Sequence, residues 1–506
     1  MAYSIGIDLG TSGAKLIVLN EAGKIIFKTS ESYPISTPYP GWSEQDPDDW
    51  WITVKKILRK ASEYLGNEVM QVKALGLSGQ MHGAVLIDKE RNVIRPAILW
   101  NDTRSYEERN WITEHVGIEN MLRLVQNFPL EGFTLPKLLW VKRNEPGNYE
   151  KIRKVLMPKD YINFKLTGRI ETEVSDASGT AYFNVLKQEW SDELLSKLSI
   201  SSYILPDVLQ SSDILGDILP SVAQELGLPE KCEVVAGGAD NACAAIGSGV
   251  IKEGMMMCSI GSSGTLLSPT RGAKHDEKGR LHFFSHAEEG MNYNMGVVLS
   301  AGMSLNWFVE NILSSFNYNG DIYELMNELA SKVPIGSEGL IFYPYLNGER
   351  TPHMNAKIRG GFIGLSLRHT LGNMARSIME GVTFALRDSL EIMKEINITP
   401  SEVILVGGGE KSRLWRQIVA DVFSLPVKVL KNNEGAALGA AILAATGGGI
   451  WRSLKEGIDK SVEVGRIIKP KFSNVERYNE YYNLFDKIFS SLKPGLEKLF
   501  DIRKKV

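Results

Sequence analysis

The sequence is poor in cysteine. It contains three in 506 residues, Cys232, Cys243 and Cys258, and none of them is part of a CxxC pair. An odd number of cysteines without that spacing indicates neither a disulfide framework nor a structural zinc site. We therefore expect a protein whose thiols stay reduced.

A long hydrophobic run is also missing. The longest apolar stretch, residues 435–451, consists largely of Ala and Gly and is shorter than the 18 or more residues that a membrane span requires. No basic residue precedes Asp8, so the first residues do not look like a signal peptide. We expect a cytoplasmic protein without a membrane segment, and a tightly packed helix that ends at glycines 447–449.

The chain carries no large excess of charge of either sign. It has 57 Lys and Arg against 60 Asp and Glu, a formal net charge of -3, so it offers no overall basic field to nucleic acid or anionic lipid. Hydrophobic residues make up 43% and charged residues 23%, as in ordinary globular proteins. The expected partner is a small molecule, with no nucleic acid and no membrane, and a homodimer is compatible with the sequence.

Strand and helix patterns alternate along the chain. Residues 4–30 read as a strand, a glycine-rich hairpin and two further strands, and helical spacing then begins at Asp46 with Pro47 just inside. The strand, turn and strand pattern returns at residues 254–269. We predict an α/β protein with a duplicated fold, divided into residues 1–248 and 249–506 where the pattern restarts.

Two glycine turns are candidate phosphate sites. The first, residues 8–15, combines a carboxylate, two hydroxyls and a lysine, and the second spans residues 261–265. Glycines let backbone N–H groups approach an anion, and a carboxylate such as Asp8 can hold Mg²⁺ through water. Each turn alone could equally be a plain hairpin, but a pair of them in two halves could grip a triphosphate from both sides. A P-loop is excluded because GxxxxGK[ST] is absent.

Other polar clusters follow predicted strands. Glycines 407–409 permit close approach by a flat ligand such as adenine, although such a cluster is more often an ordinary turn. Asp240 starts a helical pattern, where an Asp is usually a cap, and the functional alternative is a general base. Residues 79–83 and 100–104 look like sugar contacts at the ends of strands, although His82 could equally be a buried histidine.

These segments, in this order, resemble the FGGY carbohydrate kinases of the actin-like ATPase superfamily. The resemblance rests on DLGTSGAK, SGQMHG, LWNDTR, GGADNA and LNGERTPH, with two further family patterns at residues 132–144 and 360–380. It extends from Ser4 to about Thr446, nearly the full chain, and is strongest to the members that phosphorylate D-xylulose. Single motifs are weak, but the ordered set is specific.

The resemblance implies two actin-like (ribonuclease H-like) domains hinged around a central cleft, with sugar bound mainly by the first and ATP mainly by the second. It implies phosphorylation of D-xylulose to D-xylulose 5-phosphate, with ATP and Mg²⁺ as cofactors. Asp240 matches the family's general base, and Asp8 the acid associated with magnesium. The sugar-site positions are Met81, His82, Asn101, Asp102, Asp240 and Asn241; the phosphate positions are Thr11, Ser12, Lys15, Ser262, Ser263 and Thr265; the nucleotide positions are Gly302, Asn306, Gly408, Gly409 and Ser412.

Two positions depart from the family pattern. Relatives usually have Thr at the position of Ser262 and often have Gly at the position of Ala239. Because fold does not fix substrate, kinases for ribulose, gluconate, fuculose or glycerol are alternatives. An actin-like ATPase without a small-molecule acceptor is another, but it would not need Asp240 beside a sugar pocket. A sugar-binding regulator without catalysis is disfavoured because Asp8 and Asp240 are both present.

Overall fold

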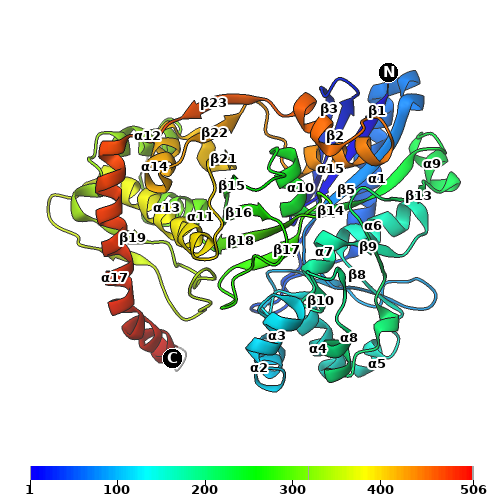
Figure 1. The fold of residues 1–506 in the computed structure, drawn as a ribbon, viewed down its shortest axis with the longest axis horizontal. Helices are drawn as coiled ribbons and strands as arrows, with labels where there is room; N and C mark the ends of the chain where they lie inside the picture. Colours follow the sequence, from blue (N-terminus) through cyan, green and yellow to red (C-terminus); the bar gives the residue numbers. More distant parts are fainter. Residues whose placement is uncertain (1, 317, 504–506) are drawn as a thin grey trace.

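The computed structural model describes residues 2–316 and 318–503. Two α/β halves lie side by side, each built on a central sheet (Figure 1). The first sheet has the order β13-β14-β5-β1-β2-β3. Its strands are β1 (Tyr3–Leu9), β2 (Gly13–Asn20), β3 (Ile25–Ser32), β5 (Val72–Gly79), β13 (Ile214–Asp217) and β14 (Glu233–Ala239).

The second sheet repeats the topology of the first. Its order is β17-β18-β16-β15-β21-β22-β23. The antiparallel run β1-β2-β3 is matched by β15-β16-β18, and the parallel neighbours β5 and β14 by β21 and β22. The predicted duplication is thereby confirmed. The strands are β15 (Met255–Ile260), β16 (Gly264–Thr270), β17 (His282–Ser285), β18 (Asn292–Val298), β21 (Glu402–Val406), β22 (Val427–Leu430) and β23 (Val464–Ile468).

Helices surround both sheets. In the first half they are α1 (Pro47–Leu65), α2 (Tyr106–His115), α3 (Ile118–Val125), α4 (Thr134–Asn144), α5 (Pro146–Tyr149), α6 (Pro158–Thr167), α7 (Val174–Ser178), α8 (Asp192–Lys197), α9 (Pro220–Leu226) and α10 (Asp240–Gly247). Thereafter they are α11 (Gly302–Trp307), α12 (Ile322–Ser331), α13 (Leu371–Glu395), α14 (Arg413–Phe423), α15 (Ala436–Gly447), α16 (Leu454–Ser461) and α17 (Phe472–Arg503). Within the described residues, no helix is long and apolar enough to cross a membrane.

Short strand pairs complete the architecture. They are β4 (Glu44–Gln45) with β7 (Ala97–Ile98), β6 (Val85–Ile87) with β8 (Lys154–Leu156), β9 (Glu171–Glu173) with β12 (Asp207–Leu209), β10 (Phe183–Asn184) with β11 (Glu189–Trp190), and β19 (Ile341–Tyr343) with β20 (Gly361–Ile363). Residues 94–100, IRPAILW, have the apolar content of a strand, but β7 covers only two of them. It begins after Pro96, which has no N–H to donate to a partner strand.

The start of α1 follows the predicted capping. The Asp46 side chain accepts a hydrogen bond of 3.0 Å from the N–H of Asp48, and Pro47 occupies the first turn. The buried residues Trp50, Val54 and Ile57 then recur at helical spacing and face the core of the first half. Local sequence therefore sets both the beginning and the buried face of this helix.

Helix α15 returns the chain to the first half. It packs against β1, β5 and α10 (Figure 1, orange). The approach is so close that a Cβ on Gly439 would lie 1.9 Å from the Cys243 carbonyl oxygen, and one on Gly247 would lie 2.2 Å from the Gly435 carbonyl oxygen. Residues 436–447 form the packed helix expected from their Ala and Gly content. In space they belong to the core of the first sheet, although they lie beyond the sequence division at residue 248.

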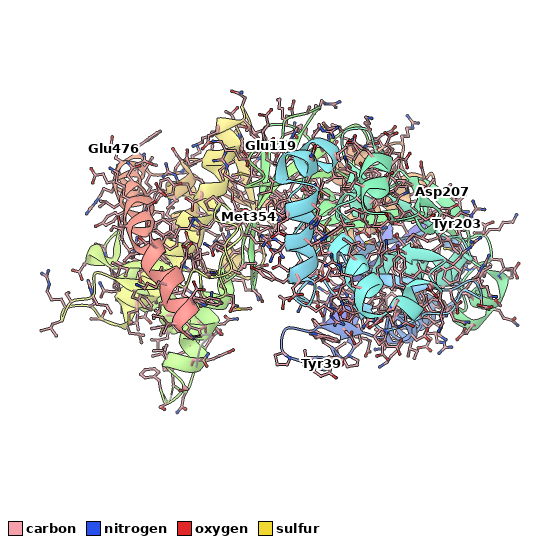
Figure 2. The ribbon with its side chains drawn as sticks, turned by 90° about the horizontal axis from the view of Figure 1, so that it is seen from below. Tyr39, Glu119, Tyr203, Asp207, Met354 and Glu476 are labelled. Carbon is pink, nitrogen blue, oxygen red and sulfur yellow. The ribbon has the colours of Figure 1, made fainter. Side chains whose placement is uncertain are left out.

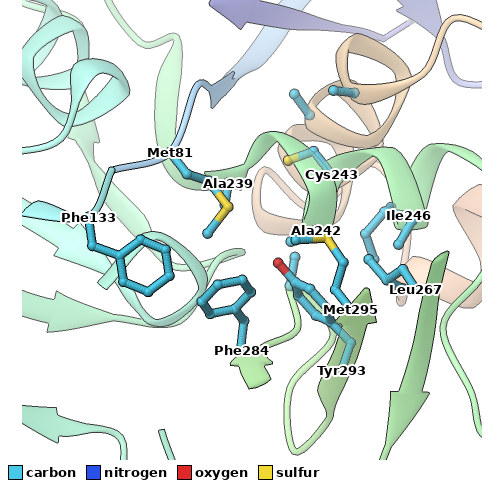
Figure 3. Packing of buried hydrophobic residues seen from close by; sticks show 14 of the residues in the cluster. Met81, Phe133, Ala239, Ala242, Cys243, Ile246, Leu267, Phe284, Tyr293 and Met295 are labelled. Atoms are coloured by element: carbon cyan, nitrogen blue, oxygen red, sulfur yellow. The ribbon is translucent and has the colours of Figure 1, made fainter. Parts of the chain in front are cut away.

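An apolar cluster joins the two halves. Met81, Ala239 and Ala242 of the first half lie close to Phe284 and Tyr293 of the second (Figure 3). All five are buried. Burial of each large side chain in such a cluster contributes about 1.5–3 kcal/mol. The cysteines are free and buried, as the reduced thiols expected from the sequence should be.

Candidate active site

Two carboxyl groups meet at one edge of the first sheet. Asp8 lies at the end of β1 and Asp240 directly follows β14. The parallel strands β1, β5 and β14 place Asp8, Ser78 and Gly238 in register. Because the carboxyl ends of parallel strands share an edge, both aspartates come to the ligand-binding edge of the sheet.

The surroundings of Asp240 suit a base near neutral pH. Its pKa is raised to about 7, first by burial and then by the charge of Asp8, against two hydrogen bonds from Asn241. Those bonds, from the backbone N and from Nδ2 of Asn241 to Oδ1, measure 2.7 and 2.8 Å. Asn241 therefore orients one carboxyl oxygen of Asp240 and leaves the other for a ligand.

Asp8 has one carboxyl oxygen without a hydrogen-bond partner in the described residues. Burial raises its pKa, while Ser78 and Lys15 lower it. Its Oδ1 is buried and has no hydrogen-bond partner among the described residues. Carboxylate oxygen is a ligand that Mg²⁺ prefers, and Mg²⁺ often uses one or two carboxylates together with substrate phosphates and water. Within residues 2–316 and 318–503, no group of three or more His, Cys, Asp or Glu is placed to hold a metal ion.

The first glycine turn is tied to neighbouring loops. The Gly10 N–H donates to the Gly13 carbonyl at 3.0 Å, and the Thr11 hydroxyl accepts from Trp100 Nε1 at 2.9 Å. Ser12 is exposed. Lys15 forms an ion pair with Glu434, from the loop before α15. Sequence reasoning missed Glu434, because nothing local in the chain relates it to a lysine more than 400 residues away.

The second glycine turn is braced by the start of α11. The N–H groups of Ala301 and Met303 donate to the Ser262 carbonyl at 3.0 and 3.1 Å. The Gly302 N–H donates to the Gly261 carbonyl at 2.8 Å, and a Cβ on Gly302 would lie 2.5 Å from that oxygen. Ser262 is exposed and Ser263 half-buried, while Thr265 Oγ1 is buried without a partner in the described residues.

A cavity of about 500 Å³ adjoins this second turn. All five predicted nucleotide positions line it, together with Ser262. The cavity also contains Asn327, whose side-chain oxygen accepts a hydrogen bond from Ser412, and the apolar side chains of Met379 and Trp415. A polar rim with an apolar floor suits a nucleoside. The sequence analysis gave these last three residues no nucleotide role; Met379 lies within the family pattern at residues 360–380, but that pattern does not show which side chains reach the cavity.

His82 is buried and hydrogen-bonded. Its ring stacks on Phe133 with centroids 4.3 Å apart, and its Nδ1 lies 2.6 Å from the Gly179 carbonyl oxygen. Burial lowers the pKa of His82 well below its usual value, so the ring is neutral at pH 7. Nε2 makes no hydrogen bond to the described residues and remains for a ligand. Met81 precedes it, only 3% exposed.

Lys137 holds the backbone around His82 in place. The sequence analysis assigned no role to this lysine. Its Nζ is fully buried and donates to the carbonyl oxygens of His82 and Gly132 at 2.8 and 2.7 Å. Lys137 lies within the family pattern at residues 132–144, which could have pointed to it. That pattern does not show which atoms accept its hydrogen bonds.

Asn101 and Asp102 lie in very different surroundings. Asn101 is exposed. The Asp102 carboxylate accepts hydrogen bonds from the Ser43 N–H at 2.6 Å and from the backbone and guanidinium of Arg104 at 2.6–3.0 Å. Arg104 also binds Glu44 at 2.6 Å. In this conformation Asp102 is thus engaged by protein groups, whereas Asn101 is open to a ligand.

The duplicated α/β fold has two glycine turns, and Asp8 and Asp240 lie together at one edge of its first sheet. These features define a phosphotransferase of the actin-like superfamily. The chain matches the N-terminal domain of the FGGY family of carbohydrate kinases over residues 3–247 and its C-terminal domain over residues 256–447. It belongs to that family, and it is an enzyme that transfers phosphate to an alcohol group.

Relatives of known name resemble the chain over its whole length. It is 42% identical to the xylulose kinase of Bacillus subtilis over 100% of both chains, and 40% identical to that of Staphylococcus xylosus, covering 97% of this chain and 100% of the other. A xylulose kinase structure from Brucella ovis has a TM-score of 0.90 at 33% identity, covering 97% of this chain and 99% of that one. A gluconate kinase structure from Lactobacillus acidophilus has a TM-score of 0.93 at 26% identity, covering 98% and 99%.

Proposed function

We propose that the protein transfers the γ-phosphoryl group of ATP to the terminal hydroxyl of D-xylulose, giving D-xylulose 5-phosphate and ADP. The assignment of the substrate rests on full-length similarity, at 42% identity, to a xylulose kinase. Met81 and His82, beside the sheet edge that carries Asp8 and Asp240, are compatible with an open-chain sugar. The free, buried cysteines support a cytoplasmic location.

Asp240 is the proposed general base. As the sugar oxygen bonds to the γ-phosphorus, the bond from that phosphorus to the β,γ-bridging oxygen breaks, and Asp240 takes the hydroxyl proton. The transition state is loose, so little proton removal is needed early and a weak base suffices. Positioning and charge neutralisation carry most of the acceleration, and the base contributes about 10²- to 10⁴-fold.

The two glycine turns are proposed to hold the phosphates from opposite sides. Thr11 and Ser12 belong to the first half and Ser262, Ser263 and Thr265 to the second, so they act together only when the cleft closes. Mg²⁺, bound by Asp8 through water, would neutralise charge on the phosphate oxygens. In this proposal Lys15 exchanges Glu434 for a phosphate.

A panel of free sugars tests the substrate. We expect D-xylulose to give the highest kcat/KM in a coupled assay of ADP production. Gluconate is included because of the gluconate kinase structure described above, along with glycerol, L-ribulose and L-fuculose. A tenfold higher kcat/KM on any of these would remove the substrate proposal. ADP release that does not depend on sugar would favour an actin-like ATPase instead.

Closure of the cleft can be measured directly. We expect slow ATP hydrolysis without sugar, and a smaller radius of gyration in X-ray scattering when D-xylulose and a non-hydrolysable ATP analogue are both present. Closure excludes water, which is the competing nucleophile. An unchanged scattering profile would contradict this part of the proposal.

A further inference from the structure

The loop formed by residues 346–353, the LNGERTPH motif, carries an arginine that faces the other half of the molecule. Its neighbours fix the loop to the end of β18. Glu349 Oε1 accepts hydrogen bonds from the N–H groups of Leu299 and Arg350 at 3.0 and 2.7 Å. Thr351 Oγ1 accepts from the Val297 N–H at 3.1 Å. With both neighbours anchored on its own half, the Arg350 side chain extends away from β18.

The Arg350 side chain lies close to Gly132, beside the residues that surround His82. Its Nη2 lies 3.4 Å from the place where a Cβ on Gly132 would stand. The Gly132 carbonyl shares the Lys137 ammonium with the His82 carbonyl, and Phe133 stacks on the His82 ring. Met354, which follows this loop, lies between the halves (Figure 2) and packs against the apolar cluster that joins them.

Arg350 lies near enough to His82 to act on its ring electrostatically. After burial, which is the largest cause, Lys137 and Arg350 lower the pKa of His82. Asp240 responds instead to burial and to Asp8.

The Arg350 guanidinium has no hydrogen-bonded partner in the described part of the chain. Within residues 2–316 and 318–503, its guanidinium makes no hydrogen bond or ion pair, and burial lowers its pKa. The nearby acids are Glu131 and Glu349. Burial raises the pKa of Glu349 to about 8, so that carboxyl is uncharged at neutral pH. Arg350 is half-buried, and its guanidinium presents five N–H donors in a planar fork.

We propose that Arg350 is a sugar-binding residue contributed by the C-terminal half, whose guanidinium donates hydrogen bonds to the acceptor oxygens that face His82. The inference rests on the proposed sugar kinase function. The acceptor then bridges the halves: Asp240 takes the proton at one end, and Arg350 holds the other end. Sugar binding and closure become one event, and sugars without oxygens at the Arg350 end are rejected.

The test compares Arg350→Gln with wild type on the best sugar of the panel. We expect KM for D-xylulose to rise about 10- to 100-fold, as for loss of hydrogen bonds from a charged group. The Kd of the ATP analogue and the melting temperature should stay unchanged, and sugar-induced compaction should disappear. Arg350→Lys keeps the charge without the fork and should lie between the two. Arg368→Gln, which removes the same charge from an exposed loop of the same half, serves as the control.

Chemical rescue separates sugar binding from a structural role. In Arg350→Ala, added methylguanidinium should restore much of the sugar affinity. A KM within twofold of wild type in Arg350→Gln, or parallel losses of sugar affinity, nucleotide affinity and melting temperature without rescue, would overturn the proposal. If wild type uses D-xylulose and Arg350→Gln is unaffected, only the role of Arg350 fails. If wild type phosphorylates no sugar, both proposals fail.

Discussion

The first half contains two kinds of carboxyl group, half-buried ones with oxygens left for a ligand and a fully buried one bound by protein groups, and their contrast indicates what each does. Asp240 accepts hydrogen bonds only from Asn241, and Asp8 has an unpartnered oxygen in the described residues. Asp102 is saturated by Ser43 and by an arginine that is itself held by Glu44. A carboxylate whose oxygens all accept hydrogen bonds from the protein stabilises the fold, whereas one with a free oxygen can bind a proton, a metal or a substrate.

The partner of Asp102 strengthens the contrast. The Arg104 guanidinium lies 3.5 Å from the ring centre of Trp42 and is 1% exposed. It therefore links Asp102, Glu44 and an aromatic face into one rigid support. Sequence position alone made Asp8, Asp102 and Asp240 look alike, since each follows or ends an apolar strand.

The largest effect should come from Asp8→Ala. In the proposed mechanism this carboxylate positions the metal and the γ-phosphate, so kcat should fall by about 10³-fold or more. The measurement is kcat together with the Mg²⁺ concentration needed for half-maximal activity. Asp8 would lose its place among the reactive carboxyls if kcat stayed within tenfold of wild type.

Asp240→Asn should come next. The amide keeps the shape but cannot take the proton, so kcat should fall at least about 10²-fold while the nucleotide Kd is retained. Single-turnover kinetics would confirm that the chemical step is slowed. Near-normal kcat in Asp240→Asn, with Asp102→Asn inactive but still binding sugar, would transfer the base role to Asp102.

Asp102→Asn tests the other side of the comparison. The substitution keeps one acceptor oxygen but removes the negative charge of Asp102, so that Glu44 is left to balance the buried Arg104 guanidinium. The protein should therefore lose about 3 kcal/mol of stability, while kcat changes little. The readouts are the melting temperature, kcat and the KM for sugar. The resemblance predicts that sugar binding weakens first; a large rise in sugar KM at an unchanged melting temperature would support that interpretation over the structural one.

The smallest expected effect is on the pH profile. Because the pKa of Asp240 is about 7, its carboxyl becomes protonated below that pH and can no longer accept a proton. The value of kcat/KM should then fall about tenfold per pH unit on the acid side. Asp102→Asn should leave this inflection in place. An inflection near pH 4 in wild type would mean that burial and Asp8 do not tune the base.

Much of the fold could be predicted from the sequence because it rests on local rules. Gly10 and Gly261 mark sharp turns after apolar strands, Asp46 and Pro47 start a helix, and the repeated strand pattern revealed the duplication. Backbone sterics and hydrophobic periodicity act over a few residues, so the chain displays them directly. The order of motifs then placed Asp8 and Asp240 at strand ends, which parallel strands bring to one edge.

What the sequence could not determine is which groups satisfy one another across the chain. The partners of Asp102, the pairing of Lys15 with Glu434, the return of α15 to the first sheet and the reach of Arg350 toward Gly132 all join segments that no local pattern relates. Hydrogen bonding and charge compensation depend on which side chains tertiary packing brings within about 3 Å. The sequence by itself determined the helices, the strands and the candidate residues. Only the tertiary structure decided which carboxyl groups are bound by other protein groups and which remain available for the reaction.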